Sequence, residues 1–156
     1  MKASVFIAAL ALALGALVTT GCSSPAEKDA VAKAEIQVFL EDFLPALGEA
    51  YAERDAYRVE AFVAQKEIAR IGKRLDELSA QGQVYEPTVR SITIEAVNTW
   101  SNSNAYVTTL ELWDVRRLAA GTDQVLTEVL EQPNRVKYQM KRDADGWRVL
   151  YRTIVN

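Results

Sequence analysis

The sequence of 156 residues contains no histidine and only one cysteine. Common zinc sites need several Cys or His ligands, and histidine is the most frequent general base in enzymes. Composition therefore excludes a common zinc site, a cysteine–histidine catalytic pair and an internal disulfide. The sequence also lacks a phosphate-cradling glycine loop, a dinucleotide fingerprint and a Ser/His/Asp set. We therefore expect neither enzymatic activity nor a metal ion or cofactor.

Charge is absent from most of the N-terminal segment. Lys2 precedes an apolar run of 14 residues from Val5 to Val18, shortly before the single cysteine, Cys22. A membrane-spanning helix needs about 20 apolar residues, so this run fits the hydrophobic region of a secretory signal better than a permanent span. A simple membrane anchor remains the alternative, because the stretch from Ala3 to Gly21 carries no charge.

Thr20, Gly21 and Cys22 resemble the end of the lipobox of bacterial lipoprotein precursors, where two small residues precede the cysteine that receives the lipid. Thr19 departs from this pattern, which prefers leucine at that position. The resemblance implies cleavage after Gly21 and multi-chain acylation of Cys22, which anchors a protein nearly irreversibly on the outer side of a membrane. Because Ser23 rather than Asp follows the cysteine, it also implies the outer membrane in a host that has two membranes.

The residues after the signal, 22–156, suffice for one domain. Without Lys2, 17 basic residues face 21 acidic ones, which gives a net charge near −4. Nucleic acids and anionic lipid headgroups bind mainly through clustered Lys and Arg, so we expect neither as a partner. We expect residues 22–29 to be a short linker and residues 30–156 to form a single domain.

Apolar residues at spacings of three and four predict helices in the first half of this domain. The first predicted helix runs from about Ala30 to Ala52, with either a kink or a junction of two helices near Pro45. A second segment covers residues 57–63. A third carries apolar residues on one face over 68–78 and ends near Gly82. Its charged face is interpreted as solvated, with a partner-binding surface as the alternative.

After Gly82 the apolar period changes to two, which predicts antiparallel strands. The predicted strands cover residues 89–100, 105–115, 125–142 and 147–155. The third of these is either one strand or a pair that is interrupted at Pro133, because proline cannot donate to a sheet. Helices followed by strands indicate an α+β fold, with helices at about 30–80 packed on a curved antiparallel sheet of about four strands at about 85–155.

The segments AYVTTLELWDV and RVKYQMKRDADGWRV, in this order, resemble the nuclear transport factor 2-like superfamily of cone-shaped α+β domains. They are most similar to the IMS domain of plastid and cyanobacterial division proteins, and the order of elements agrees over about residues 30–156. The superfamily includes enzymes, ligand binders and assembly modules, so the resemblance implies a fold but no particular reaction. It also implies that a homodimer through the sheet is possible.

Glu111 is the candidate polar site, because it shares a predicted strand face with apolar neighbours. A carboxylate there is a candidate general base or cation ligand. The alternatives are a solvated convex face, or an ion pair across the sheet with Arg135 or Arg148. Five aromatic residues are expected either to fill the core or to line a pocket for an apolar ligand: Trp100, Trp113, Tyr138, Trp147 and Tyr151.

These observations together favour a binding or scaffold module, anchored by lipid on Cys22, which engages a cell-envelope protein or a second copy of itself. Tethering at a membrane raises the local concentration of such a partner. The alternative function is that of a carrier or sensor, which holds a small apolar ligand in the cone between the helices and the sheet.

Overall fold

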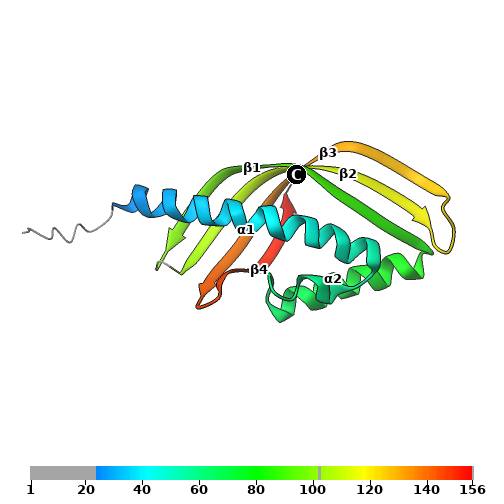
Figure 1. Ribbon diagram of the computed structural model, residues 1–156, viewed down its shortest axis with the longest axis horizontal. Coiled ribbons are helices and arrows are strands. Elements are labelled where there is room, and N and C mark those ends of the chain that lie inside the picture. Colours follow the sequence, from blue (N-terminus) through cyan, green and yellow to red (C-terminus); the bar gives the residue numbers. More distant parts are fainter. Residues whose placement is uncertain (1–23, 102, 156) are drawn as a thin grey trace, which may run out of the picture.

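The computed structural model describes residues 24–101 and 103–155, so Cys22 and the signal segment lie outside the described residues. The described part contains two α-helices, α1 (Pro25–Glu53) and α2 (Gln65–Ala80), with the short 3₁₀ helix η1 (Ala56–Val59) between them. Figure 1 shows α1 running along the inner side of a strongly bent sheet, with α2 beneath one end of it. No helix among these residues is both long enough and apolar enough to span a bilayer.

The sheet contains four antiparallel strands in the order in which they occur along the chain. They are β1 (Gln83–Trp100), β2 (Asn104–Ala119), β3 (Val125–Asp143) and β4 (Gly146–Val155). The predicted α+β fold, with helices on one side of a curved antiparallel sheet, is confirmed. β3 is continuous through Pro133, so the alternative of two separate strands is wrong.

Helix α1 begins five residues before the expected start at Ala30, so residues 25–29 are helical rather than linker. The hydroxyl of Ser24 accepts a hydrogen bond from the amide of Glu27, and a proline fits the first turn of a helix without loss. α1 also continues through Pro45 as one helix. The side chains of Leu44 and Leu47 are buried on either side of this proline, and such packing outweighs the missing hydrogen bond.

The segment at 57–63, which was expected to be helical, contains only the turn of η1. Asp55 caps this turn by accepting a hydrogen bond from the amide of Tyr57. The chain then becomes extended, and Val63 forms a bridge to Val149 of β4. Val59 and Val63 are both buried, so this connection closes one side of the core between the two helices.

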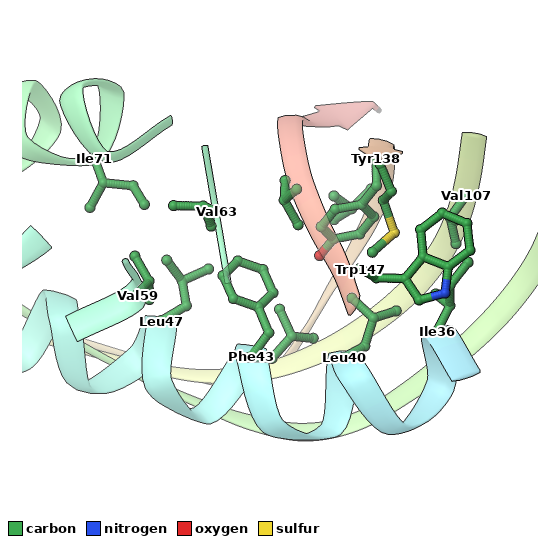
Figure 2. Close-up of a cluster of buried hydrophobic side chains, with 14 of the residues drawn as sticks. Ile36, Leu40, Phe43, Leu47, Val59, Val63, Ile71, Val107, Tyr138 and Trp147 are labelled. Carbon is green, nitrogen blue, oxygen red and sulfur yellow. The ribbon is translucent and has the colours of Figure 1, made fainter. Parts of the chain in front are cut away.

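The core lies between α1 and the inner face of the sheet (Figure 2). Ile36, Leu40 and Phe43 of α1 have no exposed surface, and they face Tyr138 and Trp147 of the sheet. Side chains therefore fill this part of the cone. A ligand has no room between these three α1 residues and the sheet.

Five register shifts interrupt the regular pairing of the strands. Two lie in the β1–β2 pairing, between Val89 and Ser91 and between Ile94 and Ala96. Another lies in the β3–β4 pairing, where Leu150 of β4 is the extra residue opposite the step from Gln139 to Met140. Each extra residue reverses the inside–outside alternation that follows it and bends the strand. These shifts decide which side chains reach the interior.

Candidate functional site

Glu111 lies in the middle of β2 on the inner face of the sheet and has no exposed surface. Its carboxylate accepts hydrogen bonds from Thr109 Oγ1 and Trp113 Nε1, both at 2.9 Å. It also accepts one from the hydroxyl of Tyr138 on β3 and one from Arg152 Nη2 on β4 at 3.1 Å. Four donors from three strands therefore converge on one buried carboxylate.

Arg152 is the ion-pair partner of Glu111, in place of the expected Arg135 or Arg148. Its side chain is 18% exposed, and its Nε also donates to the Tyr138 hydroxyl at 3.3 Å. Burial by itself disfavours the guanidinium charge, but Tyr138 and Glu111 outweigh this effect and raise the pKa of Arg152. Burial raises the pKa of Tyr138, so its phenol stays protonated.

The interior network of Glu111 and Arg152 opens into a cleft with a volume of about 200 Å³. The cleft lies between the C-terminal part of α1, α2 and the inner face of the sheet. Its lining residues come from all of these elements: Leu47, Tyr51, Arg74, Leu78, Tyr85, Pro87, Trp113, Arg117, Asn134, Arg152 and Ile154. Three of these residues are arginines, and none of the described residues that line the cleft is acidic.

Two of the arginines are held at the rim of the cleft by weak surface contacts. Arg74 donates to Glu77 of the same helix at 3.0 Å, with both side chains 46% exposed. The guanidinium of Arg117 lies 5.9 Å from the ring centre of Tyr85. Exposed ion pairs contribute little free energy, so both arginines can turn toward an incoming anion at small cost.

A second pocket of about 220 Å³ adjoins the cleft and shares Leu47, Tyr51, Arg74 and Arg152 with it. Its acidic residue is Glu67 of α2, which is buried and accepts a hydrogen bond from Arg70 at 2.8 Å. Burial raises the pKa of Glu67, and the charge of Arg70 opposes this effect. The two pockets together form one continuous, mainly basic surface under α2.

The structure does not bring the five candidate aromatic residues into one pocket. Trp113 and Tyr138 both bond to Glu111, and Trp113 also lines the cleft. Trp147 is buried near the start of α1, where its Nε1 donates to Glu35 at 3.0 Å. Trp100 and Tyr151 are 39% and 44% exposed, so their predicted place inside the cone is wrong. A register shift precedes each of them and turns it outward.

Arg152 is the residue of this site that sequence reasoning missed. In a regular strand that starts at Trp147, Arg152 would lie on the face opposite to Val149. The register shift at Leu150 brings it to the inner face instead. Arg117, in contrast, carries a signal in the sequence, because it lies six positions after Glu111 in β2, and residues at even offsets share a face of a strand.

Chemically, the site offers groups that can bind an anionic group. All the polar partners of Glu111 are donors, and Arg152 neutralises its charge. The described residues contain no group of three or more His, Cys, Asp or Glu side chains that could hold a metal ion. The arginines of the cleft offer guanidinium groups, which bind carboxylates and phosphates in a bidentate geometry.

The fold is similar to those of three solved proteins. The intermembrane space region of the chloroplast protein ARC6 superposes with a TM-score of 0.65 at 10% identity, over 77% of this chain and 93% of that one. A periplasmic fragment of TraM gives 0.56 at 11% identity, over 80% and 97%. An NTF2-like protein involved in plasmid conjugation gives 0.55 at 12% identity, over 81% and 49%. No curated protein matches the sequence.

The model of the ARC6-like IMS domain matches residues 46–150, which include the C-terminal end of α1, all of α2 and most of the sheet. This match confirms the resemblance that the strand segments indicate. The chain belongs to the ARC6-like IMS domain family, and its fold is similar to that of an NTF2-like protein.

Proposed function

We propose that this protein is a lipid-anchored, extracytoplasmic binding module that holds an acidic segment of a cell-envelope protein in the arginine-lined cleft. The observation that carries the proposal is the lining of the cleft, which includes three arginines and, among the described residues, no acidic side chain. Tyr51, Tyr85 and Trp113 lie beside them and offer apolar surface for the neighbouring side chains of a bound segment.

The location outside the cytoplasm has two independent supports. The N-terminal segment has the layout of a lipoprotein signal that ends at Cys22. In addition, two proteins of similar fold are described as an intermembrane space region and a periplasmic fragment. A membrane tether would keep the cleft at a high effective concentration relative to an envelope partner.

The alternative function, a carrier of a small apolar ligand, has less support. Side chains fill the interior beneath Ile36, Leu40 and Phe43 in the middle of α1, as Figure 2 shows. Of the five aromatic residues expected to line such a pocket, Trp113 alone lines the cleft, beside arginines that an apolar ligand would have to desolvate.

Charge reversal in the cleft is expected to weaken partner binding. We expect the double variant Arg74→Glu, Arg117→Glu to lose about tenfold or more of the partner captured by crosslinking and copurification from detergent extracts, because like charges would then face the acidic segment. Arg116→Glu is the matched control. Arg116 neighbours Arg117 in β2, but it forms ion pairs with Glu86 and Glu128 and does not line the cleft.

Equal capture by the cleft variant and the control would disprove this function for the cleft. If the captured protein proves to be a second copy of the chain, the cleft is a self-association site instead of an acidic-segment site. The unfolding midpoints of both variants are measured first and must equal that of the unchanged chain, so that loss of fold is not read as loss of binding.

The anchoring part of the proposal predicts a modified Cys22. The intact mass of the protein extracted from membranes should equal that of a chain beginning at Cys22 plus its acyl chains. Cys22→Ser should shift the protein from the membrane fraction to the soluble fraction or leave an unprocessed precursor. A mature mass without acyl chains would contradict the anchoring.

A further inference from the structure

Trp100 and Tyr106 form an exposed aromatic pair on the outer face of the sheet, away from the cleft. Their side chains are 39% and 54% exposed, and their rings stack with centres 4.6 Å apart and an interplanar angle of 29°. They lie on either side of the β1–β2 turn. Stacking of the two rings stabilises the turn. Stabilisation of the turn does not by itself explain why two large aromatic side chains remain exposed to water.

Two lysines of β3 share this face of the sheet. Lys141 pairs with Asn104 of β2, and Lys137 pairs with Thr108, two residues from Tyr106 in the strand. Paired residues project from the same face, so Trp100, Tyr106, Lys137 and Lys141 form one surface, the outer aromatic patch. The bent sheet separates this surface from α1.

The outer aromatic patch is locally basic, although the whole chain has a net charge of −3. Within the described part of the chain, neither Lys137 nor Lys141 forms an ion pair. The acidic residue Glu95 is bound by Arg135, with both hydrogen bonds at 2.8 Å. Exposed Trp and Tyr beside free lysines are the composition that proteins place at the interface between a bilayer and water.

The outer aromatic patch also lies at the end of the domain where a lipid anchor would be attached. Thr99 bonds to Asp29 in the first turns of α1, through both its amide and its hydroxyl. Figure 1 shows the start of α1 and the turns of both the β1–β2 and β3–β4 hairpins at the same end of the molecule. Cys22 precedes Ser24 by two residues, which span about 7 Å at most.

We propose that the outer aromatic patch rests on the surface of a phospholipid bilayer, with the rings of Trp100 and Tyr106 at the level of the headgroups. This inference rests on the proposed lipid anchor at Cys22, which supplies the proximity that a small patch cannot supply by affinity alone. The contact leaves the cleft at the other end of the domain open to a partner. Lysine chains at the edge of the patch reach the phosphates while the rings lie deeper.

The single cysteine allows a test that does not depend on cellular lipidation. The chain that begins at Cys22 is coupled through its thiol to maleimide lipid in phosphatidylcholine vesicles. Among the described tryptophans, Trp113 and Trp147 are 4% and 8% exposed, so Trp100 reports on the surface. We expect a blue shift of its emission and quenching by brominated lipid, about twofold or more for the Trp100 component, because the ring enters the interface.

Two variants control for position and for the aromatic pair. Trp100→Phe combined with Leu130→Trp moves the reporter to the far part of β3, where residue 130 is 65% exposed, and should abolish the quenching. Tyr106→Ser keeps the reporter and should reduce its quenching about twofold. A circular dichroism melt verifies that both variants remain folded.

Equal quenching of Trp100 and of the reporter at position 130 would overturn the inference, and so would a Trp100 emission unaffected by brominated lipid. A blue shift that depends on protein concentration and appears without vesicles would also overturn it, in favour of contact between two copies. Failure of the proposed anchor is a separate result: it appears as a missing acyl mass at Cys22 in cells and leaves the vesicle experiment intact.

Discussion

Replacing Glu111 with glutamine is expected to lower the free energy of unfolding by about 3 kcal/mol, as for other buried ion pairs that lose one partner. The carboxylate accepts hydrogen bonds from four donors and has no exposed surface. A glutamine amide offers only one acceptor oxygen. Its NH₂ group would face hydrogen-bond donors in place of acceptors, so several of the four donors would lose their partner. It also leaves the guanidinium of Arg152 without its counter-charge. Urea denaturation followed by circular dichroism measures the loss.

Glu95→Gln is the matched control for this substitution. Glu95 pairs with Arg135 in a bidentate geometry, but the side chains are 30% and 57% exposed. Water replaces the lost interaction at an exposed site, so the midpoint of unfolding should hardly change. If both variants lost a similar free energy of unfolding, the burial of the Glu111 network would not determine its contribution to stability.

Gly48→Ala is expected to destabilise the protein by about 1–3 kcal/mol, even though alanine is the better helix former by about 1 kcal/mol. A Cβ atom at Gly48 would lie 2.6 Å from the backbone oxygen of Pro87 and 4.0 Å from the ring of Trp113. Since the oxygen belongs to the backbone of β1, α1 itself must move away from the sheet. Thermal and urea unfolding, compared with the unchanged chain, measure this cost.

Gly72→Ala makes the same chemical change in α2 with the opposite expected sign. The nearest atom to a Cβ there is the Cβ of Ala56, at the ordinary contact distance of 3.9 Å. With no clash, the better helix propensity of alanine should raise the free energy of unfolding by about 0.5–1 kcal/mol. A stabilised Gly48 variant would mean that α1 does not pack on β1 as closely as described.

Residue patterns predict this structure well wherever the local period is unbroken. The face of α2 with Ile68, Ile71 and Leu75 is buried as predicted. The inner position of Glu111 also follows from alternation, because the shifts opposite this part of β2 place their extra residues in β1 and leave β2 itself regular between Val107 and Trp113. The start of α1 could have been predicted too, since Ser24 and Pro25 are ordinary signals of a helix start.

Prediction fails where a strand gains an extra residue. Trp100 and Tyr151 follow such shifts and point outward, while Arg152 follows one and points inward. Nothing in the local composition marks these positions, because a bulge depends on how two strands fit together across the sheet. The partner of the predicted carboxylate was therefore beyond the reach of pattern analysis, although the carboxylate itself was not.

The unbroken course of α1 through Pro45 has an electrostatic consequence for the proposed anchored form of the protein. At about 1.5 Å per residue, the helix from Pro25 to Tyr51 spans about 39 Å. Tyr51 lines the cleft, whereas Pro25 lies three residues after Cys22, the proposed site of the anchor. In physiological salt the field of charged headgroups decays over about 8 Å. We therefore expect the affinity of the cleft arginines for the proposed acidic segment to be independent of the lipid charge of the membrane.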